Sequence, residues 1–275
     1  MVKIRVLIED RSAGRHWAAE HGLSLLVEAR RKRWLFDTGR TGLAVENIRR
    51  SDIFPDDIDG IIISHGHYDH TGGTMAILEW GWSGPIYAHP GIFRERWNIR
   101  DRDKPRFIGC PFSRFELEAA GADMVFSRQP SEISPGVYLS GEIKREGKWV
   151  SDPALVIKKE GNYIADPFVD ERYLTLVDGE AMIVITGCCH AGLINTIEDA
   201  QSLWPDRRLK AVIGGFHLHS LSPEVLEETI HKLSRYQPER IIAGHCTGTA
   251  AEDRLKEIFG TRFERMSVGK EFILK

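Results

Sequence analysis

A run of histidines directly after an apolar strand constrains this chain more than any other feature of its sequence. Residues 64–70 read Ser-His-Gly-His-Tyr-Asp-His and follow the apolar run Ile61–Ile63. A strand end is a rigid support that can still expose side chains to a cleft, and imidazole with carboxylate suits Zn²⁺ and also Fe or Mn. A polar surface loop that merely happens to be rich in histidine is the weaker interpretation. The sequence therefore predicts a metal centre built from His65, His67, Asp69 and His70.

The order of these residues favours two neighbouring metal positions. His65 and His67 project to the same side if the backbone stays extended, because side chains alternate along a strand. Asp69 and His70 follow the start of a turn and could reach a second ion. Two ions about 3.5–4 Å apart would together activate a water molecule.

Three further histidines also follow predicted strands and are flanked by glycine. His190 lies in Gly-Cys-Cys-His-Ala-Gly, His217 in Gly-Gly-Phe-His-Leu, and His245 in Gly-His-Cys-Thr-Gly. Glycine allows tight turns and close approach of the backbone, so one edge of the sheets is expected to collect ligands. The other histidines lack this context and are expected to be structural or exposed: His16, His21, His89, His219 and His231.

Size and charge restrict the class of protein. With 275 residues the chain can form one large domain, and its formal net charge of −3 disfavours a nucleic-acid binder that relies on phosphate contacts. There is no signal-peptide pattern, and no apolar run approaches the roughly 20 residues that span a bilayer. Four cysteines in a chain of this length do not resemble a secreted disulfide framework. We expect a cytoplasmic protein with reduced thiols, without a membrane or nucleic-acid partner.

The predicted elements fall into two similar halves, each with strands first and strand–helix alternation afterwards. Two sheets packed face to face with helices outside would satisfy this pattern. In the first half we expect strands at 2–8, 23–28, 33–36, 61–63 and 86–88, and a helix from about 71 to 80. In the second half we expect strands at 137–141, 154–157, 182–186, 211–213 and 241–243, and helices at 193–204, from 223 and at 251–259.

Residues 91–130 are the least regular part of the sequence. They mix aromatic and charged residues and contain two prolines, which indicates long loops or an insertion. An insertion beside a site often forms a substrate-binding lid, although a structureless surface loop is an equal alternative. We expect a single domain over residues 1–275 that carries this loop-rich insertion or lid.

The motifs together resemble the metallo-β-lactamase superfamily. The histidine run matches its H-x-H-x-D-H signature, and Phe36-Asp-Thr-Gly39 and Gly244-His245 extend the resemblance along most of the chain. The segments around His190, His217 and His245 resemble one subgroup, the metal-dependent hydrolases similar to the archaeal dihydropterin–ribofuranosylaminobenzene phosphate synthase. The resemblance implies an α+β fold, a four-layer αββα sandwich, with the metals at the edge between the two sheets.

The resemblance also implies roles for single residues. His65 and His67 match ligands of a first metal, and Asp69, His70 and His245 match ligands of a second. Two departures from the family pattern concern the remaining ligands. The usual Pro-Gly-His-Thr segment is not recognisable near residues 140–142, and Thr186-Gly-Cys188 stands where relatives carry Thr-Gly-Asp.

These departures leave the metal count open between one ion and two. His190 could supply the missing imidazole, and Cys188 or Cys189 could act as a thiolate ligand. The alternative that both cysteines are small core residues is favoured.

Three classes of function remain open. In the first, a metal-dependent hydrolase activates a water molecule to attack an ester, lactone or phosphoester. Asp69 would orient that water and accept its proton, His217 would donate a proton or contact a substrate phosphate, and Asp37 would orient a ligand histidine.

The second class is a pterin-type synthase that forms a C–N bond with release of pyrophosphate. Aromatic residues of the insertion could then stack on a flat heterocycle: Phe93, Trp97, Phe107 and Phe112. A metal-binding protein without catalytic activity is the third class. The expected partner is a small molecule, phosphorylated or pterin-like.

Overall fold

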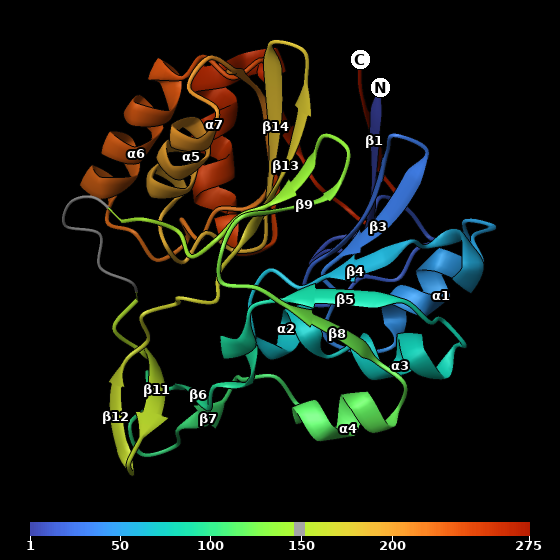
Figure 1. Ribbon diagram of the computed structural model, residues 1–275. Helices are drawn as coiled ribbons and strands as arrows, with labels where there is room; N and C mark the ends of the chain where they lie inside the picture. Colours follow the sequence, from blue (N-terminus) through green and yellow to red (C-terminus); the bar gives the residue numbers. More distant parts are fainter. Residues whose placement is uncertain (146–151) are drawn as a thin grey trace. The chain divides into compact units, whose positions relative to one another are not determined.

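The computed structural model describes residues 1–145 and 152–275, which form two compact units. The first unit comprises residues 1–128, 152–170 and 267–275, and the second comprises 129–151 and 171–266, of which 146–151 lie outside the described residues. Figure 1 colours the ribbon by residue number, so the segments of each unit can be followed in it.

The first unit is built on a seven-stranded sheet in the order β18-β1-β2-β3-β4-β5-β8. Neighbours from β18 to β3 are antiparallel, and β3, β4, β5 and β8 are parallel. The strands are β1 (Val2–Ile8), β2 (Ser24–Ala29), β3 (Lys32–Phe36), β4 (Gly60–Ile62), β5 (Pro85–Ala88), β8 (Asp123–Phe126) and β18 (Glu271–Leu274). The five strands expected in the first half are confirmed, with ends shifted by one residue or less.

Helices cover one face of this sheet (Figure 1). They are α1 (Leu43–Arg49), α2 (Tyr68–Thr71), α3 (Thr74–Glu79) and α4 (Arg114–Ala119), with 3₁₀ turns η1 (Pro55–Asp57) and η2 (Pro90–Phe93). Ile48 of α1, Ile77 of α3 and Leu117 of α4 pack with strand residues in one buried apolar cluster. The helix expected from about 71 to 80 is divided between α2 and α3. Gly72 and Gly73 lie at this division because a Cβ at either position would meet backbone oxygens at 2.1 Å.

A smaller sheet completes the first unit and accounts for part of the segment at 91–130. It has the order β12-β11-β6-β7, with β6 (Arg96–Asn98), β7 (Arg106–Phe107), β11 (Leu155–Lys159) and β12 (Asn162–Ala165). Loops make up much of the segment, as the sequence predicts, yet it also contributes β6, β7, α4 and β8. The pattern did not predict these elements because strands of two to four residues and a six-residue helix are too short to show periodicity.

The second unit holds another seven-stranded sheet, in the order β17-β16-β15-β14-β13-β10-β9. Its strands are β9 (Ser131–Ser134), β10 (Val137–Leu139), β13 (Tyr173–Asp178), β14 (Ala181–Thr186), β15 (Arg208–Gly215), β16 (Arg240–Gly244) and β17 (Phe263–Arg265). β14 to β17 are parallel, so β14, β15 and β16 end at the same edge of the sheet. Each of these three strands is directly followed by a segment that carries a candidate histidine.

The helices of the second unit gather beside its sheet (Figure 1). They are α5 (Leu193–Leu203), α6 (Pro223–Arg235) and α7 (Thr249–Phe259), with 3₁₀ turns η3 (His245–Thr247) and η4 (Gly260–Arg262). The three predicted helices are confirmed, and Ser222 caps α6 by accepting a hydrogen bond from the Val225 backbone N–H. Ile197, Leu233 and Leu255, one from each helix, are buried with strand residues in the core of this unit.

Among the described residues, no helix has the length and apolar character needed to cross a bilayer.

Candidate metal centre

The histidine run gathers its rings immediately after β4. His65 Nε2 lies 3.1 Å from His67 Nδ1, and the ring centroids of His65 and His70 are 4.2 Å apart. The turn into α2 at Tyr68 places Asp69 beside them, with its Oδ2 4.0 Å from His70 Nε2. All four predicted donors are buried, at 0–6% exposure. The first unit therefore concentrates three imidazoles and one carboxylate in a single small volume.

The spacing of these donors fits a metal ion. Two nitrogens bound to the same tetrahedral Zn²⁺, each at 2.0–2.1 Å, are separated by about 3.3 Å. The 3.1 Å between His65 Nε2 and His67 Nδ1 is close to this value. Imidazole and carboxylate are also the ligand types that zinc accepts. The residues present thus fit a divalent metal ion.

Gly66 separates the two histidines because no larger residue fits there. A Cβ at this position would meet the Ile92 carbonyl oxygen at 2.0 Å and Arg96 Nη1 at 2.5 Å. Its backbone N–H donates to Asp170 Oδ2 at 2.9 Å. The Arg96 guanidinium, also fully buried, pairs with both Asp170 and Asp166. A buried ion network therefore fixes the backbone between His65 and His67, and the sequence did not single out any of its charged residues.

Asp37 orients one of the candidate ligands, as the sequence predicts. Its Oδ2 lies 2.7 Å from His70 Nδ1, and its two oxygens also accept hydrogen bonds from the backbone and hydroxyl of Ser64. A carboxylate on Nδ1 holds the imidazole in the tautomer that leaves Nε2 for a metal. Asp37 is completely buried and adopts a φ of +58°, a backbone strain that is typical of functional positions.

His21 is exposed, as the sequence predicts, and it also contacts a candidate ligand. Its Nε2 lies 3.1 Å from Asp69 Oδ2, and its Nδ1 lies 3.0 Å from Asp10 Oδ2. Hydrogen bonds to Asp10 and Asp69 raise the pKa of the His21 imidazole to about 10. It therefore carries a proton at neutral pH and donates to both carboxylates. A lone histidine far from the motif along the chain gave no sequence signal for this contact.

A second donor set lies in the second unit, beyond the ends of β14 and β15. The rings of His190 and His217 have centroids 4.3 Å apart. One ligand atom from each of Cys188, His190 and His217 falls within 4.8 Å of the others, and all three side chains are buried. Soft thiolate and imidazole together suit zinc. The structure therefore brings the predicted His190 and His217 into one group, with Cys188 added to them.

His245, which follows β16, belongs to a group that contains two sulfur atoms. It lies with Cys188 and Cys246, again within 4.8 Å between ligand atoms. Burial alone would raise the pKa of the Cys246 thiol, but a hydrogen bond to Cys188 and the neighbouring His217 and His245 lower it well below its usual value. A lowered pKa favours the thiolate, the form that binds metals. The sequence interpretation did not include Cys246.

The adjacent cysteines 188 and 189 differ in their surroundings. Cys189 is packed in the apolar core of the second unit, and burial raises the pKa of its thiol well above the usual value. This confirms the core interpretation for Cys189. Cys188 instead belongs to both donor groups. The sequence left open whether the two cysteines are ligands or core residues, and the structure places Cys189 in the core and Cys188 among the candidate ligands.

Glu171 supports the His190 segment through the backbone. Its two carboxylate oxygens accept hydrogen bonds from the N–H groups of His190 and Ala191. Glu171 is 2% exposed, and it precedes β13, a strand that the sequence did not predict. Two donor residues of this set are also strained, with φ of +47° at His217 and +50° at His245. Such left-handed backbone at non-glycine residues is costly and clusters at functional sites.

The remaining histidines have other roles. The His89 side chain accepts a hydrogen bond from the Gly91 backbone and caps η2, and His219 Nδ1 lies 2.9 Å from the Cys246 carbonyl oxygen. His16 and His231 are exposed. In residues 140–142, where the family ligand segment was missing, the Ser140 hydroxyl accepts from the Tyr173 N–H.

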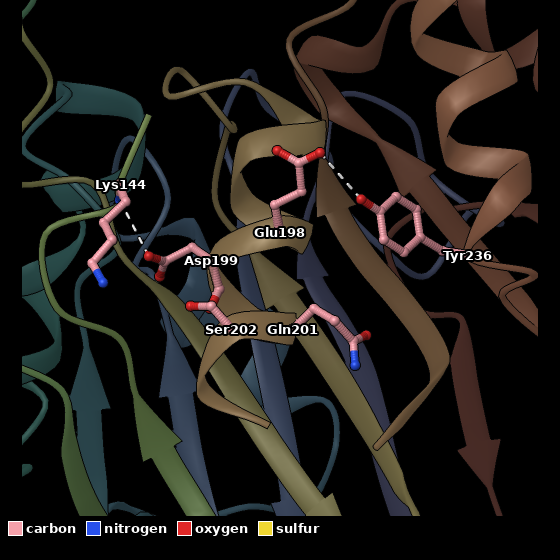
Figure 2. Close-up of a pocket in the computed structure, with 6 residues that line it drawn as sticks. All are labelled: Lys144, Glu198, Asp199, Gln201, Ser202 and Tyr236. Carbon is pink, nitrogen blue, oxygen red and sulfur yellow. Dashed lines mark hydrogen bonds between the residues drawn. The ribbon is translucent and has the colours of Figure 1, made fainter. Parts of the chain in front are cut away.

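One cavity of the second unit contains none of the predicted donors. It has a volume of about 360 Å³ and is lined by Lys144, Glu198, Asp199, Gln201, Ser202 and Tyr236. Figure 2 shows the Tyr236 hydroxyl directed at Glu198, 3.2 Å away, and Asp199 next to the Lys144 backbone. Asp199 also accepts a 2.7 Å hydrogen bond from Tyr173. These contacts hold α5 to its neighbours, which is a structural role.

Known proteins resemble this chain over its whole length. The sequence profile of the metallo-β-lactamase superfamily matches residues 18–125. The 7,8-dihydropterin-6-methyl-4-(β-D-ribofuranosyl)-aminobenzene-5′-phosphate synthase of Methanocaldococcus jannaschii is 34% identical over 285 residues, covering 98% of this chain and 95% of that protein.

Solved structures agree with these sequence matches. The metal-dependent hydrolase Tm1679 of the β-lactamase superfamily superposes with a TM-score of 0.86 at 28% identity, covering 100% of this chain and 99% of that one. The Zn²⁺-bound PqqB of Methylobacterium extorquens has a TM-score of 0.56 at 13% identity, covering 99% of this chain and 100% of that one. At this low identity, the similarity to PqqB shows a common fold and nothing more.

Proposed function

We propose that this chain is a zinc-dependent hydrolase of small molecules. The chain belongs to the metallo-β-lactamase superfamily, and within it to the subgroup similar to the archaeal dihydropterin–ribofuranosylaminobenzene phosphate synthase. The chain has the metallo-β-lactamase fold, as the sequence predicts. The substrate would be an ester, a lactone or a phosphoester.

One observation carries the proposal: the buried cluster of His65, His67, Asp69 and His70, with His70 oriented by Asp37. Burying three imidazoles and a carboxylate together is unfavourable unless they are paired or bind a cation. A carboxylate on the far nitrogen of a ligand histidine is a frequent arrangement in zinc enzymes. A metal-binding function accounts for both features at once.

The chain's own residues would divide the catalytic work. A bound zinc ion lowers the pKa of a coordinated water to about 7 and stabilises negative charge on the reacting oxygen. Asp69 would orient the attacking water and accept its proton, while the protonated His21 holds the Asp69 carboxylate in place. His217 would donate a proton to the leaving group or contact a substrate phosphate. His65, His67 and His70 would hold metal.

Substitution of the cluster tests this function. We expect His65→Ala or Asp69→Asn to lower the turnover of a panel of esters, lactones and phosphoesters by at least about a thousandfold. His65→Ala should also lower the metal content of the purified protein, measured by elemental analysis. His16→Ala, which removes an exposed imidazole, is the matched control. Turnover that survives in both cluster variants would rule out the hydrolase mechanism, and metal without any turnover would favour a metal-binding protein.

The second donor set extends the proposal to further ligands. We propose that His190 and His245 also bind metal, and that Cys188 rather than Cys189 contributes sulfur. In protein loaded with Co²⁺, Cys188→Ser should remove sulfur-to-metal charge-transfer absorption and Cys189→Ser should leave it unchanged. An equal spectrum in both variants would exclude sulfur ligation. Metal titration would decide between one ion and two.

A synthase is a second candidate, because the relative that is 34% identical over 98% of the chain has that activity. The substrates would be a pterin pyrophosphate and a phosphorylated arylamine, joined by a C–N bond with release of pyrophosphate. Incubation of the metal-loaded protein with both substrates distinguishes the candidates. A joined product supports the synthase, and simple hydrolysis of the pyrophosphate supports the hydrolase.

Two broader expectations belong to the same proposal. We propose that residues 1–275 act as one metallo-β-lactamase-like domain, and that residues 91–130 contribute to substrate binding as a lid. The proposed compartment is a reducing one such as the cytoplasm, where cysteine thiols stay reduced.

A further inference from the structure

Tyr68 lies between the candidate ligands His67 and Asp69, and two arginines converge on its ring. The Arg40 guanidinium carbon lies 5.6 Å from the ring centroid, and the Arg106 guanidinium carbon lies 5.9 Å from it. Both arginines are exposed, and Tyr68 is half-buried. They come from different parts of the chain, since Arg40 follows β3 and Arg106 belongs to β7. Two guanidinium groups therefore lie within 6 Å of one aromatic ring, whose chain neighbours are candidate metal ligands.

The backbone determines the positions of both arginines. The Arg40 N–H donates to Glu20 Oε1 at 3.1 Å, and Gly72 lies so close to Arg40 that a Cβ there would meet the Arg40 carbonyl oxygen at 2.1 Å. On the other side, the chain that leaves β7 pairs with the histidine run, because the Tyr68 N–H donates to the Ile108 carbonyl oxygen at 3.1 Å. The convergence is thus set by packed backbone.

Neither guanidinium is neutralised by a carboxylate of the described chain, residues 1–145 and 152–275. The neighbouring Glu20 carboxylate accepts hydrogen bonds from the Arg40 and Thr41 backbone and from the Thr41 hydroxyl instead. Many other arginines of the protein do form ion pairs, for example Arg5, Arg33 and Arg254. Two positive charges near the same ring repel each other, so an anion that contacts both guanidinium groups would be stabilised.

We infer that Arg40 and Arg106 form an anion subsite that binds a phosphate group of the substrate. Guanidinium groups bind phosphate oxygens through paired, charge-assisted hydrogen bonds, and two of them match the charge of a phosphate dianion. The inference rests on the proposed function, in which His67 and Asp69 beside Tyr68 serve the reacting centre. It narrows the substrate to phosphorylated small molecules, and assigns recognition of the phosphate to residues outside the metal-binding motif.

Titration with inorganic phosphate tests the subsite without any turnover. In calorimetric titrations of the metal-loaded protein, we expect Arg40→Gln and Arg106→Gln each to weaken phosphate binding by about tenfold, and the double variant by about a hundredfold. Arg40→Lys should recover part of the loss, because it restores the charge without the paired geometry. Arg31→Gln is the matched control, since Arg31 is exposed in the turn at the opposite end of β3.

The outcomes separate this inference from the proposed function. Unchanged phosphate binding in the double variant, or an equal loss in Arg31→Gln, would overturn the subsite even if the protein hydrolyses esters. A protein without turnover whose double variant still loses phosphate binding keeps the subsite and contradicts the hydrolase. Thermal unfolding of each variant excludes loss of fold as the cause.

Discussion

The two donor sets are supported by different kinds of interaction. In the first unit, buried carboxylates and a guanidinium surround the histidine run: Asp37 binds His70, and Arg96 holds Asp170 against Gly66. In the second unit, Glu171 binds the backbone of the His190 segment, and the Cys246 sulfur accepts from the His217 N–H at 3.3 Å. The first set is thus held mainly by contacts between charged side chains, and the second by contacts to backbone N–H groups, made by the Glu171 carboxylate and the Cys246 sulfur.

This difference shows how each set obtains rigidity. The first set occupies one continuous turn, so a few ion pairs around that turn can fix all of its members. The second set follows three parallel strands, whose common edge already places its members in one region. The first set should therefore depend more strongly on single supporting side chains than the second.

The largest effect is expected at Arg96. Arg96→Met should lower the free energy of unfolding by about 3–5 kcal/mol, because it leaves Asp166 and Asp170 buried without their cation. Arg172→Met is the matched comparison in the second unit. Arg172 is equally buried but donates to the carbonyl oxygens of Ser140 and Gln129, and it pairs with no carboxylate of the described residues.

Arg172→Met is expected to cost less than about 1 kcal/mol. Burial disfavours the charge of Arg172 and lowers its pKa to about 10, so removing that charge offsets the loss of two hydrogen bonds. Denaturant unfolding of both variants measures the difference. Equal losses would show that the two units do not differ in their dependence on buried charge.

A smaller effect is expected at Asp37. Asp37→Asn should weaken metal binding by about 10–100-fold, because an amide binds the Nδ1–H of His70 less strongly and does not raise the basicity of the ring. Competition with a chelator measures the affinity. Asp56→Asn, which changes an exposed carboxylate of the same unit, should leave the affinity unchanged. An unaltered affinity in Asp37→Asn would mean that His70 needs no orienting group.

The sequence predicted the first set because its residues are contiguous. His65, His67 and Asp69 fall within one short segment after an apolar strand, and both the family signature and the strand can be recognised in the amino-acid sequence. Asp37 was expected to orient a ligand histidine, and its Oδ2 lies 2.7 Å from Nδ1 of the candidate ligand His70.

Other contributors could not be predicted, because long-range pairing creates them. Asp170 and Arg96 are separated by 74 residues, and Tyr173–Asp178 gave no periodic pattern despite forming a central strand. His21 is 48 residues from Asp69 along the chain, as the residue numbers show, so no local spacing connects them. Sequence patterns report local geometry, whereas these contacts depend on how separate elements pack.

Glu171 provides the next test of the comparison. Glu171→Gln should lower the free energy of unfolding by about 1–2 kcal/mol, because an amide offers one acceptor oxygen to two buried N–H groups. Glu180→Gln, at an exposed turn of the same unit, is the control. A loss as large as that of Arg96→Met would remove the distinction between the two donor sets.

The smallest effect is expected at His21, which is the exposed part of the first set's support. Its side chain is 48% exposed, so water screens its charge and His21→Gln should cost at most about 1 kcal/mol of folding stability. Metal affinity should fall by less than tenfold, since Asp69 keeps its place in the α2 turn. The catalytic constant should fall more than the Michaelis constant changes, because His21 positions Asp69 rather than binding substrate. If His21→Gln instead weakened metal binding as strongly as Asp37→Asn, an exposed imidazole would support the site as effectively as a buried carboxylate, and burial would not be what makes the first set rigid.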